Sequence, residues 1–164
     1  MLKRTHLCGQ LRETDAGTTA TLCGWVNTYR DQGKGLVFID LRDRTGLTQI
    51  VFDQEDVPDD VMELSRGLRR EDVVAVSGTI RVRDGGPNPK LDTGAIELVG
   101  SVLEVLNSTE NPPILPDDHE ADKIDEEIRL RHRYIDLRRP RMQSILGLRS
   151  EVARHTRNFF AEHG

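Results

Sequence analysis

Apolar and polar residues alternate along the first 107 residues in short runs that turn signals interrupt. Alternation with a period of two, in runs rich in β-branched residues, is typical of strands that bury one face. Five such runs are present, at 19–30, 36–42, 47–52, 73–84 and 95–106. After the third run Val61, Leu64 and Leu68 recur at helical spacing instead. This change of period predicts a helix over 57–68.

The order β-β-β-α-β-β is the arrangement of the OB-fold, a five-stranded, partly open barrel. The sequence therefore predicts an all-β OB-fold barrel over 1–107, with its helix between strands three and four. In such barrels strands two and three and the adjoining loops bind oligonucleotides or oligosaccharides. Because the same fold also serves structural and protein-binding roles, the ligand has to be inferred from individual residues.

Two further zones follow the predicted barrel. Residues 108–125 combine prolines with an acidic cluster, which is typical of a linker or hinge. Residues 126–164 contain a predicted helix from Pro140 onward. Its apolar residues at near-helical spacing are Ile145, Leu148, Val152 and Phe159. An apolar stripe with nothing after it needs a partner, so we expect 126–164 to be the start of a truncated α+β domain.

The composition indicates a soluble globular protein, with 36% hydrophobic and 31% charged residues. No apolar run approaches the roughly 20 residues of a membrane span, and the amino terminus has no apolar signal-peptide core. The two cysteines, Cys8 and Cys23, are too few for a disulfide framework and lack the spacing of a metal site. We therefore expect a cytoplasmic protein with buried thiols and no metal.

The net charge of −5 appears unfavourable for a nucleic-acid partner, because phosphate binding favours cationic surface. The charges are segregated, however. Residues 108–127 hold eight acidic residues and one lysine, whereas residues 128–164 hold nine arginines and three acidic residues. The net charge therefore does not exclude nucleic acid.

Phe38 is the residue of the second strand that most needs an explanation. Val37, Ile39 and Leu41 share one face, so Phe38 points to the other face, beside Asp40. Two interpretations are open. The ring is either a stacking platform for an unpaired base, worth roughly 1–3 kcal/mol, or an aromatic packed at the edge of the barrel under a loop.

Other polar side chains accompany the last three strands. The direction of Gln49 cannot be assigned, since apolar residues flank both faces; its amide could read a base edge or be solvated. Alternation turns Glu97, Arg81 and Arg83 outward. A carboxylate there could accept hydrogen bonds from base amino or imino groups, and the alternative is ordinary surface charge.

A glycine-rich loop, Gly85-Gly86, precedes Pro87-Asn88-Pro89. It has no Lys-Ser/Thr and no following helix, so it is not a P-loop, although Asn88 could contact a sugar or phosphate. The histidines are scattered without a matched nucleophile, base or metal partner. We therefore expect no catalytic residue in this chain.

Several segments together resemble a known family. They read RTH at 4–6, LCGWV at 22–26, FIDLRDR at 38–44, TG at 93–94 and RYIDLRRP at 133–140. In these segments the chain resembles the amino-terminal, anticodon-binding region of bacterial-type aspartyl-tRNA synthetases, which are class IIb enzymes, and the resemblance covers its whole length. The last segment is the most specific.

The resemblance implies a role for four residues in reading the anticodon of tRNA(Asp). Phe38 would stack on the central base, a uridine, and Gln49 would hydrogen-bond the edge of that base. Glu97 would read the first base, a guanine or modified guanine, and Arg30 would contact the second or third base.

The resemblance also implies that Arg81, Arg83 and Asn88 hold the surrounding RNA backbone. One position departs from the family pattern: many members have consecutive arginines before Arg30, whereas this chain has Thr28-Tyr29 and one extra residue in the turn at 31–35. Tyr29 is then a candidate substitute contact by stacking.

For the full-length protein the resemblance implies ligation of L-aspartate to tRNA(Asp) with ATP and Mg²⁺, through aspartyl-adenylate. The helix from Pro140 would begin motif 1, the homodimer interface, and motifs 2 and 3 would lie beyond Gly164. The chain alone is therefore expected to bind no cofactor and to be inactive. The resemblance does not decide whether tRNA(Asn) is also charged.

Two other functions stay open at this stage. A general single-strand binder would bind RNA with little dependence on the anticodon sequence. A structural spacer would bind no RNA even at low salt.

Overall fold

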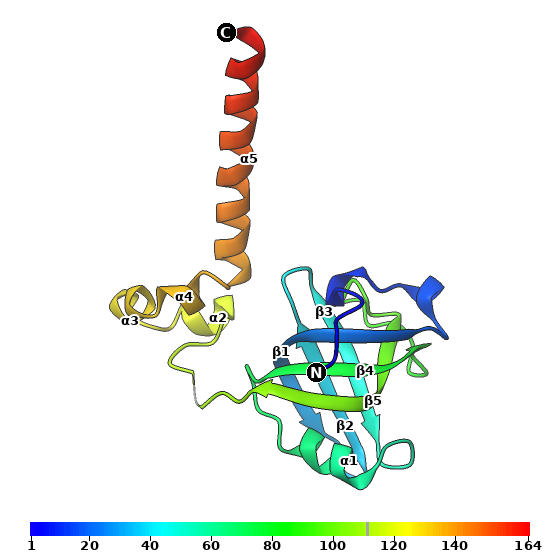
Figure 1. Ribbon diagram of the computed structural model, residues 1–164. Coiled ribbons are helices and arrows are strands. Elements are labelled where there is room, and N and C mark those ends of the chain that lie inside the picture. Colours follow the sequence, from blue (N-terminus) through cyan, green and yellow to red (C-terminus); the bar gives the residue numbers. More distant parts are fainter. Residues whose placement is uncertain (111) are drawn as a thin grey trace. The chain divides into compact units, whose positions relative to one another are not determined.

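The computed structural model describes residues 1–110 and 112–164 (Figure 1). Asn111, which belongs to the predicted linker, lies outside the described residues. The chain divides into two compact units, Met1–Glu110 and Asn111–Gly164.

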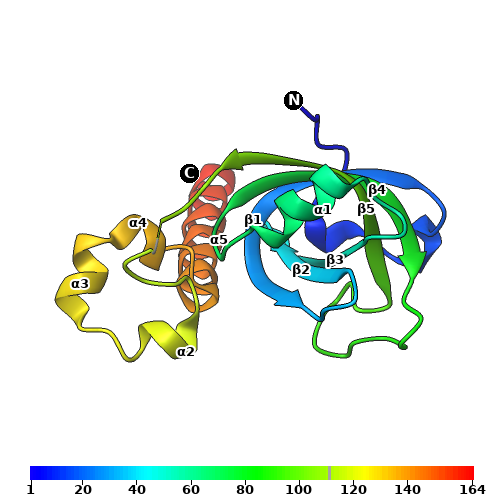
Figure 2. The ribbon, with the colours of Figure 1, turned by 90° about the horizontal axis from the view of Figure 1, so that it is seen from below.

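Five strands form the first unit, and they confirm the OB-fold predicted from the sequence pattern. They are β1 (Thr19–Asp31), β2 (Leu36–Arg42), β3 (Leu47–Asp53), β4 (Val73–Val82) and β5 (Ile96–Asn107). They close into a barrel in the order β1-β2-β3-β5-β4 (Figure 2). The β3–β5 pair is parallel, and the other four pairs, including β1–β4, are antiparallel.

The barrel is filled by the inward faces of its strands. On β2, fully buried Val37, Ile39 and Leu41 alternate with half-buried residues, as a strand with one core face requires. Two glycines stand where a side chain would clash with its neighbours. A Cβ at Gly78, next to a β-bulge, would lie 1.9 Å from the Val99 carbonyl oxygen, and one at Gly100 would lie 2.4 Å from the Phe52 ring.

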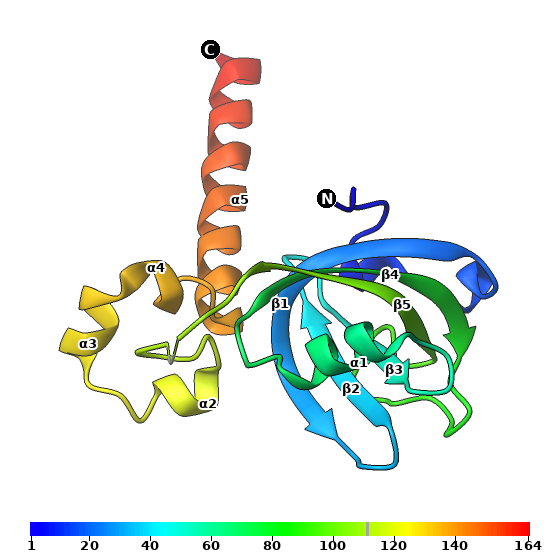
Figure 3. The ribbon, with the colours of Figure 1, turned by 60° about the horizontal axis from the view of Figure 1, so that its bottom comes forward.

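Helix α1 (Asp59–Arg66) lies across the opening of the barrel (Figure 3). It is shorter than the predicted 57–68, because Pro58 occupies the cap position and the helix ends at Gly67. The predicted apolar face is also partly wrong. Met62 and Ser65 are the buried residues, whereas Leu64 is exposed.

The segment before β1 contains two short 3-10 helices, η1 (Cys8–Gln10) and η2 (Glu13–Asp15). The Asp43 carboxylate, from the turn between β2 and β3, accepts hydrogen bonds from the Cys8 amide at 2.8 Å and from the Thr45 amide at 2.7 Å. The amino-terminal segment is thereby tied to the barrel, and Cys8 is fully buried. Cys23, also expected to be buried, is only half-buried.

The second unit is helical. Its elements are α2 (Asp118–Ala121), α3 (Glu126–Arg131), α4 (Arg133–Asp136) and α5 (Pro140–His163). The short helix α2 lies within the range that the sequence pattern assigns to a linker. Helix α5 is present where the apolar spacing predicts it, and the four apolar residues of its stripe are exposed: Ile145, Leu148, Val152 and Phe159.

Arg139 is the largest buried side chain of the second unit and is only 2% exposed. It forms ion pairs with Asp118 at 3.0 Å, Asp136 at 3.2 Å and Asp122 at 3.3 Å. A buried guanidinium needs such compensation for the water that it has lost. Acidic residues of the expected linker are therefore structural partners of the arginine-rich segment that follows.

Within the part of the chain that the structure describes, no helix has both the length and the apolar character needed to cross a membrane.

Candidate nucleic-acid interface

The pairing of the strands aligns polar residues across the outer surface of the barrel. Residues paired in adjacent strands point to the same side of the sheet. Arg30 pairs with Phe38 across β1 and β2, and Asp40 pairs with Gln49 across β2 and β3. On the other side of β5, Arg81 pairs with Glu97. The registers therefore bring residues that are up to 67 positions apart in the sequence into one row.

Glu97 is the centre of this row and is only 5% exposed. The Gln49 side-chain amide donates to Glu97 Oε2 at 2.8 Å, and the Arg81 guanidinium approaches Oε1 at 2.8 Å through both Nε and Nη2. Gln49 is 3% exposed, so the direction that alternation left unassigned is decided by this contact. Both oxygens of the nearly buried carboxylate thus have polar partners, as burial of a charge requires.

Arg30 continues the row from Gln49 toward β1 and β2. Its Nη2 donates to Gln49 Oε1 at 3.3 Å and lies 3.6 Å from Asp40 Oδ1. The Asp40 carboxylate also accepts a hydrogen bond from the Thr28 hydroxyl. The Arg30 side chain is 51% exposed, so its guanidinium is held in place and still accessible.

Phe38 provides an aromatic surface on the same face. The Arg30 guanidinium lies 5.9 Å from the centroid of its ring, within the range of a cation–π interaction. The ring is half-buried, in contrast to the fully buried Val37 and Ile39. An accessible ring beside amide and guanidinium groups is an arrangement that can stack an unpaired base and bind its edge.

Arg83 and Asn88 lie outside this connected row. Arg83 follows the end of β4 and is half-buried, and its buried Nη1 has no hydrogen-bond partner among the residues that the structure describes. Asn88 lies in the connection between β4 and β5, where its Oδ1 accepts from the Lys90 amide at 3.1 Å and its backbone amide donates to Gly94 at 2.8 Å. Its side chain therefore shapes the loop.

Tyr29 faces away from Arg30 and Phe38. It pairs with the buried Ile39, packs against the barrel core and donates its hydroxyl to the Arg66 carbonyl at 3.3 Å. Burial, together with the nearby negative charge of Asp31, raises the pKa of its phenol. The structure does not bring this ring beside Phe38.

A second polar group, to which the sequence pattern assigns no role, lies at the Thr28 end of the row. Arg42 donates to Asn27 Oδ1 and to Glu71 Oε2, each at 2.7 Å. Alternation along β2 places Arg42 on the face of Phe38, although it assigns the residue no role. It could not have found Glu71, which precedes β4 and has a left-handed backbone with φ of 70°.

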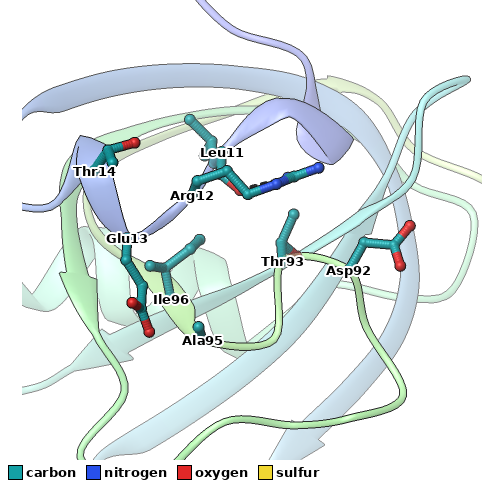
Figure 4. Close-up of a pocket in the computed structure, with 8 residues that line it drawn as sticks. All are labelled: Leu11, Arg12, Glu13, Thr14, Asp92, Thr93, Ala95 and Ile96. Carbon is teal, nitrogen blue, oxygen red and sulfur yellow. Dashed lines mark hydrogen bonds between the residues drawn. The ribbon is translucent and has the colours of Figure 1, made fainter.

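A separate pocket of about 340 Å³ lies between the amino-terminal segment and the connection that precedes β5 (Figure 4). Leu11, Ile96 and Ala95 supply apolar lining. Two of its polar lining residues are engaged in local structure: Arg12 Nη1 donates to the Gly9 and Leu11 carbonyls, and the Thr93 hydroxyl donates to the Leu47 carbonyl. The pocket also contains the carboxylates of Glu13 and Asp92, and it lies apart from the row of polar residues around Glu97.

No group of three or more histidine, cysteine, aspartate or glutamate side chains that could hold a metal ion occurs among the residues with described positions.

Comparison with protein families gives two matches. Residues 20–106 match the family described as OB-fold nucleic acid binding domain, and residues 125–164 match the family described as tRNA synthetases class II (D, K and N).

Known proteins match over nearly the whole chain. An aspartate–tRNA(Asp/Asn) ligase of Anaeromyxobacter dehalogenans is 52% identical over 99% of this chain and 26% of its own length. Among solved structures, the asparaginyl-tRNA synthetase of Pyrococcus horikoshii has a TM-score of 0.84 at 24% identity, covering 100% of this chain and 35% of that one. An aspartyl-tRNA synthetase of Entamoeba histolytica has a TM-score of 0.85 at 19% identity, covering 99% and 38%. The chain spans about a quarter of the length of the curated relatives that it matches.

Proposed function

Because this chain belongs to the family of OB-fold nucleic acid binding domains, we propose that its barrel recognises the anticodon of tRNA(Asp). The observation that carries the proposal is the connected row Arg81–Glu97–Gln49–Arg30 beside the accessible ring of Phe38. Sequence-specific recognition of RNA loops uses this combination of a stacking ring and edge-directed hydrogen-bonding groups. The curated relatives, named as aspartate–tRNA(Asp/Asn) ligases, support the choice of RNA.

In this proposal Phe38 stacks on the central uridine and the Gln49 amide hydrogen-bonds its edge. Arg30 contacts the second or third base. Its guanidinium is already held by Gln49 and Asp40, so less side-chain freedom is lost on binding.

Glu97 reads the first base. A carboxylate offers about four lone-pair sites, so acceptor capacity remains beside the contacts from Gln49 and Arg81. A guanine edge presents imino and amino donors that match this acceptor, whereas an adenine or a pyrimidine presents a different pattern.

We also propose backbone contacts for Arg81 at the Glu97 end of the row, for Arg83 just after β4 and for Asn88 in the loop before β5. Arg81 has a second task, because its ion pair orients Glu97. The side chain of Arg81 is 44% exposed, which leaves part of the guanidinium accessible to a phosphate.

The activity of the whole protein is part of the same proposal. The full-length protein would be a cytoplasmic aspartate–tRNA ligase that consumes ATP with Mg²⁺, and this chain would supply tRNA selection. Neither ATP nor Mg²⁺ is assigned to a residue of this chain. The exposed apolar stripe of α5 supports the proposed homodimer contact.

Binding of a fluorescent anticodon stem-loop, followed by anisotropy, tests the assignment. Phe38→Ala is expected to weaken binding of the GUC loop roughly 5- to 150-fold, the equivalent of one lost stacking contact. Phe38→Tyr keeps the ring and is the matched control. Glu97→Ala should also weaken binding, whereas Glu63→Ala on the exposed surface of α1 should not. Unchanged affinity in both Phe38→Ala and Glu97→Ala would refute this face as the site.

Scrambled loops separate the alternatives. A general single-strand binder would bind GUC and scrambled loops equally, with a steep loss of affinity as salt rises. A purely structural barrel would bind neither loop at low salt.

A further inference from the structure

A groove adjoins the Arg30 end of the base-binding row. It lies between the β1–β2 hairpin and the segment 67–72 that joins α1 to β4, and its volume is about 590 Å³. Its lining residues are Thr28, Tyr29, Arg30, Asp40, Leu68, Arg69 and Arg70. The groove therefore continues the proposed RNA-binding surface onto the segment 67–72, which contains none of the proposed anticodon contacts.

The groove is locally cationic although the chain carries a net charge of −5. Among the described lining residues three are arginines and one, Asp40, is a carboxylate that Thr28 and Arg30 engage. The nearby Asp31 acts on Tyr29 but is not a lining residue. The nearby Arg42 does not add to this charge, because its ion pair with Glu71 is 2.7 Å long. A concave surface with excess guanidinium groups attracts anions.

The segment that carries Arg69 and Arg70 is fixed to the barrel by its backbone. The Glu71 amide donates to the Val26 carbonyl at 2.8 Å, and the Val26 amide donates to the Asp72 carbonyl at 2.9 Å. Within the segment, the Arg69 amide donates to Asp72 Oδ2 at 2.8 Å. Arg70 Nε donates to the Asn27 carbonyl at 3.0 Å, which orients its guanidinium and directs the remaining donors elsewhere. Both arginine side chains are exposed. The Arg70 guanidinium is thus held at the groove, the backbone fixes the position of Arg69, and both cations remain accessible.

We propose that this groove binds a backbone phosphate of the RNA strand, next to the nucleotides read by Phe38 and Gln49, and that Arg69 and Arg70 are its ligands. The planar guanidinium fork matches the geometry of a phosphate. Leu68 and Tyr29 also line the groove and offer apolar surface to the adjoining ribose. In this proposal Tyr29 lies beside the path of the RNA backbone. The proposal rests on the proposed function, because it extends the same binding face.

The experiment compares wild type with the double variant Arg69→Gln/Arg70→Gln, using stem-loops in which one phosphate at a time is a neutral methylphosphonate. In wild type, one position adjoining the bases should lose affinity several-fold when its charge is removed. In the double variant, the same methylphosphonate replacement should cause no further loss of affinity. The variant should weaken GUC and scrambled loops by a similar factor and should reduce the salt slope by about 0.7 for the single phosphate lost.

Lys3→Gln/Arg4→Gln is the control of equal charge change. These residues precede Thr5, whose amide bonds Thr21 on the wall where β1 pairs with β4. The control should leave the methylphosphonate pattern and the salt slope unchanged.

Three results would overturn the groove proposal: wild-type affinity in the double variant, a methylphosphonate penalty that persists in that variant, or an equal loss in the control. Failure of the proposed function is a different result, since wild type would then bind GUC and scrambled loops equally or would bind neither.

Discussion

Gln49 and Glu97 lie side by side on the parallel strands β3 and β5, and the amide of Gln49 donates to the carboxylate of Glu97 at 2.8 Å. With Arg81 on the other oxygen, Glu97 is oriented before any ligand arrives. An oriented acceptor loses little freedom on binding, which favours selective recognition of a base edge. Gln49, Glu97 and Arg81 therefore form one hydrogen-bonded group, in which the position of each side chain depends on the others.

The first prediction concerns the charge of Glu97. Glu97→Gln preserves the size of the side chain but removes the ion pair with Arg81 and one strong acceptor. We expect the preference for guanine over adenine at the first anticodon position to fall by about 1–3 kcal/mol, measured from anisotropy titrations of the two stem-loops. Arg81→Gln should cause a smaller loss of the same preference. A Glu97→Gln protein that retains full preference would contradict the assigned role.

The second prediction concerns Asp43 and acid stability. Burial alone would raise the pKa of this carboxyl, but hydrogen bonds from the Thr45 side chain and from backbone amides outweigh it and lower the pKa below its ordinary 3.8. A carboxyl with a depressed folded-state pKa stabilises the fold above its unfolded-state pKa, and this contribution disappears as the pH falls through the folded-state value.

Asp43→Asn should therefore lower the free energy of unfolding at neutral pH, and the difference from wild type should shrink below a pH of about 4. Urea unfolding at a series of pH values measures this difference. The exposed Asp84→Asn is the control and should show no such trend. A difference that stays constant down to strong acid would show that the ionised carboxylate is not what joins η1 to the β2–β3 turn.

The third prediction concerns the start of α5. Asp118 Oδ2 accepts from the Arg141 amide at 3.0 Å, so a residue of α2 caps a helix that begins 22 positions later in the sequence. Its Oδ1 binds Arg139 at 3.0 Å. Asp118→Ala should destabilise the first turn of α5 by roughly 0.5–2 kcal/mol, the usual cost of a lost cap.

Hydrogen exchange at the Arg141 amide reports this change directly, because that amide loses its acceptor. Exchange should accelerate in Asp118→Ala and stay at the wild-type rate in Glu120→Gln, a change at an exposed ion pair on the same helix. Unchanged protection in Asp118→Ala would mean that another group caps α5.

The fourth prediction concerns the two thiols. Burial, assisted by the charge of Asp43, raises the pKa of Cys8, and burial raises that of Cys23 to a smaller degree. Cys23 is partly exposed and Cys8 is not. Because the thiolate is the reactive form, iodoacetamide at pH 8 should label Cys23 first and Cys8 only at the rate of unfolding. Peptide mass spectrometry over time would detect the reverse order if the burial of Cys8 were incorrect.

The pattern of apolar residues was sufficient to predict the strands of the barrel, because burial of one face of a strand imposes a period of two on the sequence. Val37, Ile39 and Leu41 alternate as a core-facing strand must, and Phe38 is consequently on the outer face. The pattern failed at α1, where the small, hydrogen-bonded Ser65 is buried and Leu64 is exposed. The spacing of apolar residues within the helix does not determine which face of α1 packs against the end of the barrel.

Tertiary structure decided how the candidate site is assembled. The outward direction of Gln49 follows from the parallel pairing of β3 with β5, a contact across 48 residues that alternation within either strand cannot encode. The same holds for the groove, since Arg69 and Arg70 face Arg30 only because the segment after α1 returns to β1. The sequence by itself determined the strands, the fold class and the outer face of Phe38 through local periodicity. The ion-pair network, the groove and the cap on α5 depend on long-range contacts, and these exist only once the chain has folded.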